Sequence, residues 1–205
     1  MNDKLWRYDK MRNSGKIWVV LVVILVVALL FGVGVFKWYV SGFNRAVGLD
    51  EGSKTAWSNV DTSLQRRLDL IPNLIATVKG YASHEKELFE NLAGSREKYF
   101  QADTKADKIQ ASNELSGMLS RLMVLRESYP ELKANQNFLK LQDQLEGTEN
   151  RINVARIRYN EAAKLLNSYT REFFGSFFCG KAGVEKTEYF EASEKAKTEV
   201  PKVKF

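Results

Sequence analysis

The sequence predicts an all-α protein in which one N-terminal transmembrane helix is followed by a long antiparallel four-helix bundle. Three observations predict this fold class. An uncharged apolar run extends from Ile17 to Phe36, and two long segments repeat apolar residues at alternating spacings of three and four. The 205-residue chain contains only three prolines and no alternating β-branched run that ends in a hairpin signal. It is too short for a multidomain enzyme.

The apolar run is long enough to cross a bilayer. Twenty helical residues rise about 30 Å, the thickness of the hydrocarbon core of a membrane. Trp18, Trp38 and Tyr39 flank the run, where aromatic side chains suit the headgroup level. A cleaved signal peptide is the competing interpretation, but its apolar region spans about 7–15 residues and ends in small residues. We therefore expect a single-pass signal anchor over residues 17–38, after a basic tail of residues 1–16.

The charge distribution is explained by membrane topology. Six basic and two acidic residues flank the run, so this part supplies +4 of the formal net charge of +6. The rest of the chain then carries no basic stripe, and nucleic-acid binding is not expected. More of these basic residues precede the run than follow it, which favours a cytoplasmic N-terminus and a bundle on the extracytoplasmic side of the cell (inner) membrane.

The first bundle helix is predicted by a packing stripe on the a and d positions of one heptad frame. Asp61 is the single exception within the stripe, and Pro72 lies inside it. A proline removes the hydrogen bond to the carbonyl of Leu68, so we expect one bent helix, with two abutting helices as the alternative. The members of the stripe are Trp57, Leu64, Leu68, Ile71, Ile75, Val78 and Ala82.

The last long helix has the cleaner pattern, because a strict three-four spacing runs from Phe138 to Phe173. Shorter helices are expected from Glu85 to Gln101 and from Lys105 to Ser128, and Asn135 or a neighbour should cap the last helix. Short connections favour antiparallel neighbours. The predicted domains are therefore a bundle over residues 44–173 and an aromatic and charged C-terminal extension over residues 174–205.

A phenylalanine-rich segment follows the bundle. An up-down-up-down topology returns the end of the fourth helix to the membrane, so Phe174, Phe177 and Phe178 are candidates for membrane contact. A hydrophobic cap that closes the bundle is an equally good interpretation.

The sequence offers no catalytic, metal or cofactor site. His84-Glu85 begins like a zinc-protease motif, but the second ligand position is Leu88 and the chain has no other histidine. We expect His84 to be a surface or capping residue near a helix start. Cys179 is a lone cysteine, so it forms no internal disulfide and does not distinguish one compartment from another. Its only conceivable general base is His84, and no spacing brings the two together. Neither a cofactor nor a small-molecule substrate is expected.

Two polar features are candidates for recognition. One is the run Gln65-Arg66-Arg67, and the other is the set Asn153, Asn160 and Asn167, spaced by sevens. For the asparagines an ordinary solvated face is favoured over a binding ladder, and for the arginines ion pairs within the bundle are favoured over a partner site.

Several motifs along the chain are distinctive. The first is residues 65–74, Gln-Arg-Arg-Leu-Asp-Leu-Ile-Pro-Asn-Leu, and others follow at residues 134–138, at 145–152 and at the closing residues 201–205, Pro-Lys-Val-Lys-Phe. These motifs resemble those of the LemA family of bacterial membrane proteins. The resemblance implies an N-terminal anchor on a LemA-like antiparallel four-helix bundle, and it implies no catalysis.

The resemblance and the patterns together favour a non-enzymatic membrane-anchored scaffold or adaptor of the bacterial envelope, acting through protein–protein contacts. Expected partners are the lipid bilayer and either the chain itself, as a homo-oligomer, or another membrane protein such as a metalloprotease. A lipid-interacting, membrane-shaping module that uses the phenylalanine-rich segment is the alternative.

Overall fold

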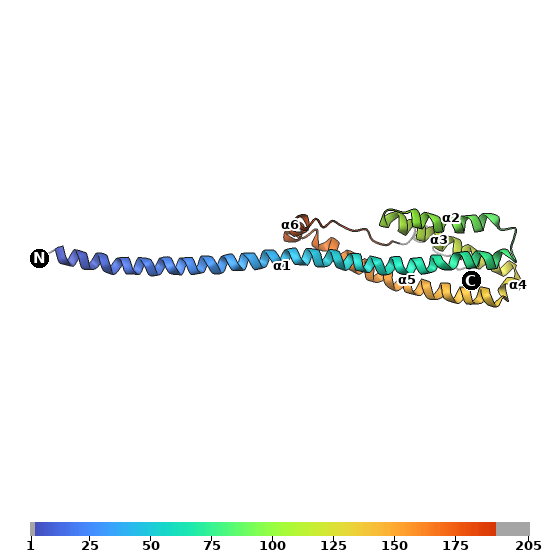
Figure 1. Ribbon diagram of the computed structural model, residues 1–205, viewed down its shortest axis with the longest axis horizontal. Helices are drawn as coiled ribbons and strands as arrows, with labels where there is room; N and C mark the ends of the chain where they lie inside the picture. Colours follow the sequence, from blue (N-terminus) through green and yellow to red (C-terminus); the bar gives the residue numbers. More distant parts are fainter. Residues whose placement is uncertain (1–2, 192–205) are drawn as a thin grey trace, which may run out of the picture.

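The computed structural model describes residues 3–191, with side chains from Trp18 onward, and within this range every regular element is a helix (Figure 1). The fold class predicted from the sequence is confirmed. The elements are α1 (Asp3–Lys79), α2 (Lys86–Gln101), α3 (Lys105–Leu125), a 3₁₀ turn η1 (Arg126–Ser128), α4 (Pro130–Lys133), α5 (Gln136–Tyr169) and α6 (Phe173–Ala182).

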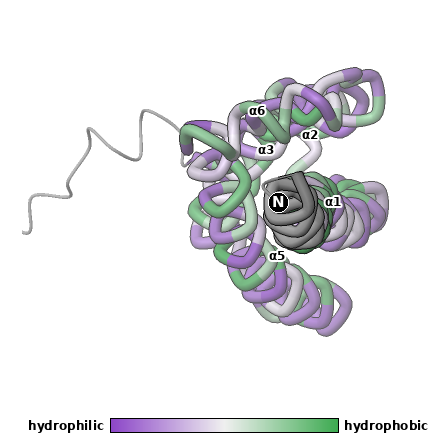
Figure 2. The backbone as a smooth tube through the Cα atoms, turned by 90° about the vertical axis from the view of Figure 1, so that its left-hand side faces the viewer, coloured by the Kyte–Doolittle hydropathy of each residue, from purple (hydrophilic) through white to green (hydrophobic). Residues whose placement is uncertain are grey.

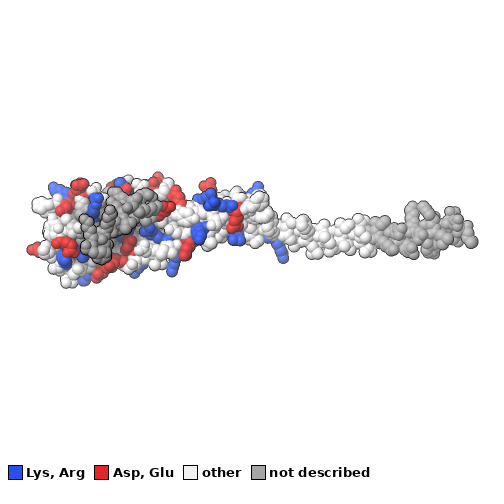
Figure 3. Space-filling view, turned by 180° about the vertical axis from the view of Figure 1, so that it is seen from behind, with Lys and Arg blue, Asp and Glu red and all other residues white. Residues whose placement is uncertain are grey.

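The anchor and the first bundle helix are one continuous helix. α1 is 77 residues long, and its N-terminal half projects alone from the bundle (Figure 1). Every side chain from Trp18 to Val40 is exposed, and this stretch is long and apolar enough to cross a membrane. Figure 3 shows Lys, Arg, Asp and Glu spread over the bundle and absent from the apolar stretch. An exposed helix of this composition suits a lipid environment, as expected for a membrane anchor.

Pro72 does not divide α1 into two helices. The carbonyl of Leu68, which loses its usual helical donor, accepts a hydrogen bond from Arg96 Nε of α2 at 3.3 Å. The neighbouring helix therefore satisfies the group that the proline leaves without a partner, and this favours one helix over two abutting ones.

The bundle packs around the C-terminal half of α1. α5 lies along α1, α2 pairs with α3, and Figure 2 shows the four long helices end-on with α1 between α2 and α5. The first stripe contributes Leu64, Leu68, Ile71, Val78 and Ala82 to the core as predicted, and Val60 and Leu74 join them. α5 contributes buried residues at the predicted spacing, from Phe138 through Leu145, Ile152 and Tyr159 to Leu166 and Tyr169.

Two helix starts agree with the sequence analysis. Asn135 caps α5, because its side-chain Oδ1 accepts hydrogen bonds from the backbone amides of Asn137 at 2.9 Å and Phe138 at 3.0 Å. His84 is exposed, one residue before Glu85, which precedes the first turn of α2.

The last long helix, α5, ends earlier than its three-four spacing predicts. α5 stops at Tyr169, and Phe173 is 85% exposed at the start of α6. The chain folds back so tightly that a Cβ atom on Gly175 would lie 2.0 Å from the backbone oxygen of Tyr169. Only glycine permits this approach. The heptad pattern misplaced the end of α5 because both sides of this turn are helical and apolar.

Candidate interaction site

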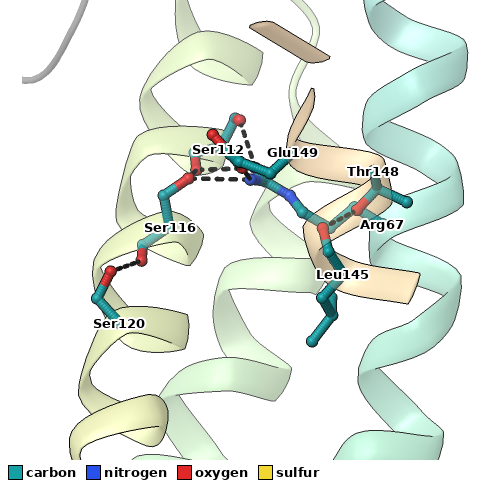
Figure 4. A network of polar contacts seen from close by, with 7 residues as sticks. All are labelled: Arg67, Ser112, Ser116, Ser120, Leu145, Thr148 and Glu149. Atoms are coloured by element: carbon teal, nitrogen blue, oxygen red, sulfur yellow. Dashed lines mark hydrogen bonds and ion pairs between the residues drawn. The ribbon is translucent and has the colours of Figure 1, made fainter. Parts of the chain in front are cut away.

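One residue of the predicted recognition run Gln65-Arg66-Arg67, Arg67, lies in the interior of the bundle. This side chain is 2% exposed and extends from α1 between α3 and α5 (Figure 4). Its guanidinium donates to Glu149 Oε2 at 2.8 Å, to Ser112 Oγ at 2.9 Å and to Ser116 Oγ at 3.1 Å. Burial lowers the pKa of Arg67, and the carboxylate of Glu149 acts in the opposite direction. This is the ion pair within the bundle that was favoured for Arg67, so that side chain is not available on the outer surface.

A second polar cluster explains why an acidic residue interrupts the packing stripe. Asp61 accepts hydrogen bonds from the Tyr99 hydroxyl at 2.6 Å, from Lys108 Nζ at 2.9 Å and from Gln65 Nε2 at 3.3 Å. Burial and the bond to Asp61 both raise the pKa of Tyr99 well above its usual range. Asp61 therefore ties α1 to both α2 and α3. Gln65, the first residue of the predicted run, is exposed beside it.

The asparagine series binds the chain's own C-terminal segment. Residues 184–191, which we call the strap, run along the bundle after α6 (Figure 1). Asn167 Nδ2 donates to the oxygen of Thr187 at 2.8 Å, and the amide of Thr187 donates back to Asn167 Oδ1 at 2.9 Å. Asn160 forms the same two bonds with Phe190, at 3.0 Å and 2.8 Å. The solvated face expected here is wrong for these two positions, whereas Asn153 is exposed.

The rise of a helix and of an extended chain explains why the two strap-binding asparagines are seven residues apart. Seven residues of an α-helix rise about 10.5 Å, and three residues of an extended chain span about 10 Å. The seven-residue step from Asn160 to Asn167 therefore matches the three-residue step from Phe190 back to Thr187. Helix and strap run antiparallel, and the two asparagines recognise backbone groups rather than particular side chains.

Side chains complete the attachment of the strap. Phe190 is 2% exposed, with the Trp57 ring 6.4 Å away and the Arg156 guanidinium 4.4 Å above its ring. The Tyr159 hydroxyl donates to the oxygen of Glu188 at 2.6 Å, and Asn113 of α3 donates to the oxygen of Glu191 at 3.3 Å. The strap therefore bridges α3 and α5 and covers part of the core.

Arg66 lies on a different face and lines a groove between α1 and α5 of about 860 Å³. Arg151 and Arg158 of α5 line the same groove, and Val154, which is 48% exposed, contributes apolar surface. Among residues 18–191, none of these three guanidinium groups forms a salt bridge with a described side chain. Glu51 is the only acidic residue of the lining, and Lys54 Nζ lies 3.3 Å from its carboxylate. We call this feature the arginine groove.

The predicted membrane-contact residues separate into two kinds. Phe178 is 2% exposed and packs with Ala46, Leu166 and Tyr169. Phe174 and Phe177 are 55% and 46% exposed. Phe178 therefore fits the hydrophobic cap, which was one of the two interpretations. The side chains of Phe174 and Phe177 remain exposed.

The described part of the chain holds no group of three or more His, Cys, Asp or Glu side chains arranged to bind a metal ion. Cys179 is buried, and burial raises the pKa of its thiol, which disfavours the reactive thiolate.

Sequence reasoning missed the partners of the polar residues. Ser112 and Ser116 are four residues apart on α3 and bind Arg67, and Trp57 and Tyr159 contact the strap at Phe190 and Glu188. The available signals were a polar residue at a stripe position and small hydroxyl residues one helical turn apart in α3.

Three relatives carry informative names. The chain is 23% identical to "Protein LemA" of Metamycoplasma hominis over 177 residues, which cover 85% of this chain and 81% of that protein. It is 22% identical to "Magnetosome protein MamQ 2" of Paramagnetospirillum magneticum over 194 residues, covering 82% and 71%. It is also 22% identical to "Magnetosome protein MamQ" of Magnetospirillum gryphiswaldense over 174 residues, covering 72% and 64%. A model of the LemA family matches residues 56–205, and the chain therefore belongs to the LemA family.

Proposed function

We propose that this protein is a non-enzymatic, membrane-anchored scaffold or adaptor of the bacterial envelope, and that its arginine groove docks an acidic segment of another membrane protein. The observation that carries the proposal is the groove itself. It combines apolar surface from Val154 with Arg66, Arg151 and Arg158, whose charges have no carboxylate partner among the described residues.

Charge complementarity identifies the class of partner. A groove with three guanidinium groups and one already paired carboxylate attracts acidic side chains and disfavours basic ones. Arginine also binds carboxylates in a two-point geometry that lysine does not reproduce. A helical or extended segment that presents acidic residues beside apolar ones fits this lining.

Photocrosslinking in the native membrane tests the proposal. A photoreactive amino acid at Asn59 or Val154 in the full-length protein should capture a second membrane protein. Changing Arg66 and Arg151 to glutamate should abolish the capture, because the groove would then repel an acidic segment. The matched control changes the exposed Lys140 and Lys164 to glutamate, which alters net charge equally and leaves the groove intact.

Other results would redirect or remove the proposal. Crosslinks only between copies of this chain would instead indicate a homo-oligomeric scaffold. Capture that persists in the Arg66→Glu, Arg151→Glu variant would show that the groove is not the docking site.

The orientation that fits this function has the N-terminus in the cytoplasm and the bundle outside, because basic residues are more numerous before the apolar run. A cysteine placed at the exposed Val124 should react with a membrane-impermeant maleimide in cells whose outer barrier is opened. Buried Cys179 gives little background. Reaction only after lysis would reverse the proposed orientation.

The second candidate function is a lipid-interacting, membrane-shaping module. The exposed phenylalanines of α6, beside the membrane end of the bundle, are the observation that favours it.

A further inference from the structure

We propose that α6 is a bilayer-binding helix. Its Phe173, Phe174 and Phe177 side chains insert at the boundary between headgroups and acyl chains of the membrane that α1 crosses, and neighbouring Arg171 and Lys181 bind the phosphate groups of acidic phospholipids. This inference does not depend on the arginine groove.

α6 lies beside α1 just beyond the end of the apolar stretch (Figure 1). The Phe174 ring lies 5.2 Å from the Trp38 ring, and the Phe177 ring lies 6.4 Å from the Tyr39 ring. Trp38 and Tyr39 follow directly after the apolar run and Lys37, and such aromatic residues are enriched at the level of the lipid headgroups. Figure 1 shows α6 beside α1 at the place where the bundle begins. These contacts hold α6 at the membrane surface.

One side of α6 is packed against α1 and the end of α5. Phe178 is buried, and a Cβ atom on Gly42 of α1 would lie 2.2 Å from its ring, so the missing side chain at Gly42 admits Phe178. The Tyr169 hydroxyl donates to the oxygen of Gly42 at 3.0 Å. α6 is therefore fixed to α1 through one buried side and the end of α5, and its position does not depend on lipid.

The other side of α6 is apolar and exposed. Phe173, Phe174 and Phe177 are 85%, 55% and 46% exposed, although α6 has only ten residues and one charged side chain, Lys181. A contiguous exposed apolar surface marks a site of interaction. Because this surface adjoins the membrane-spanning stretch of α1, the bilayer is the occupant that must already be present next to it.

Most charged residues next to α6 in the sequence and on the adjoining turns of α1 are basic. Near α6 the exposed basic residues are Lys37, Arg45, Arg171 and Lys181, and Glu172 is the only acidic residue among positions 37–46 and 170–183. The Lys181 ammonium lies 5.9 Å from the centre of the Phe177 ring, and the Arg45 guanidinium lies 4.9 Å from that of Tyr169. Aromatic and basic side chains side by side are the composition that binds anionic bilayer surfaces.

Depth measurements on the full chain test the insertion. Spin labels on cysteines at Phe173 and Phe177, in vesicles of phosphatidylcholine and phosphatidylglycerol, report accessibility to oxygen and to a water-soluble nickel chelate. Val124 supplies the matched control, because it is 73% exposed in α3 at the far end of the bundle. The unmodified chain, whose only cysteine is buried, measures the background. We expect higher oxygen and lower nickel accessibility at 173 and 177 than at 124. Equal values at the three positions would overturn the proposal.

Lipid selectivity tests the role of the basic residues. The full chain purified from vesicles of both lipids should retain phosphatidylglycerol above its bulk fraction, measured by mass spectrometry. The Arg171→Gln, Lys181→Gln variant should lose this enrichment, and a Lys140→Gln, Lys164→Gln control should keep it. Unchanged enrichment in the first variant would overturn the assignment of the phosphate-binding groups, even if the spin labels report insertion.

Discussion

The Arg67–Glu149 ion pair provides the sharpest test of the bundle interior, because replacing one partner should cost much more stability than replacing the other. Arg67 is 2% exposed, whereas the side chain of its partner Glu149 is 47% exposed. Glu149→Gln leaves a buried guanidinium without its counterion, and breaking a buried pair in this way costs about 3–5 kcal/mol. Because water reaches Glu149, we expect the lower value, about 3 kcal/mol. For a chain of this length that corresponds to a fall in melting temperature of roughly 6–12 °C.

The reverse substitution should be mild. Arg67→Met removes the buried charge and fills much of its volume, while Glu149 can turn to water and Ser116 keeps its bond to the oxygen of Ser112. Replacing a buried ionic group by an apolar one is often nearly neutral, so we expect a loss below about 1 kcal/mol. The double variant should match Arg67→Met alone, because the two residues act as one pair.

Thermal unfolding of the full chain in detergent micelles, followed by far-ultraviolet circular dichroism, measures these differences. Glu114→Gln is the control, since Lys98 and Glu114 form a pair of similar length, 2.9 Å, with side chains 66% and 34% exposed. An exposed pair contributes about 0–1 kcal/mol. If Arg67→Met destabilises more than Glu149→Gln, the reasoning from burial and desolvation is refuted.

Three further predictions concern the strap, α6 and alkaline pH. Asn167→Ala removes two hydrogen bonds to the strap, worth about 2 kcal/mol together, so the strap amide that it binds should exchange hydrogen roughly 30-fold faster, whereas Asn153→Ala should leave that rate unchanged. Gly42→Ala should lower the melting temperature, because its new methyl group meets a buried ring at 2.2 Å, whereas Gly48→Ala, with nothing within 4 Å, should raise it through helix propensity. The raised pKa of Tyr99 adds stability that is complete below pH 10.0, the ordinary pKa of a tyrosine, and is lost as pH rises above it. The melting temperature of Tyr99→Phe should therefore fall less between about pH 9 and 11 than that of the parent chain, and an equal fall would contradict this assignment.

Local rules were enough to predict most of the fold. The uncharged run, the three-four spacing and the capping preference of Asn135 each depend on residues close together in the sequence, and each has its counterpart in the structure. The same spacing failed at the end of α5, because the turn before α6 depends on the contact between Gly175 and Tyr169, which a periodic pattern does not contain.

The polar interior could not be predicted in the same way. Arg67 lies between two stripe positions and Asp61 replaces one, so each was identified as unusual without its partner. The partners come from α2, α3 and α5, which only the assembled bundle brings together. The strap could not be predicted from the sequence for a similar reason. It has no periodicity of its own, and Asn160 and Asn167 bind it mainly through its backbone.

The apolar stretch and the first bundle helix are parts of the same uninterrupted helix, α1, so a rotation of one also rotates the other. The helix ends at Lys79, 42 residues after Lys37, and this stretch is roughly 63 Å long without a break. Transmembrane helices adjust their tilt to the thickness of the surrounding bilayer. A change in tilt of about 10° would move the far end of such a rod sideways by roughly 11 Å. In a protein anchored through this helix, a change in local bilayer thickness would therefore displace the far end of the bundle sideways.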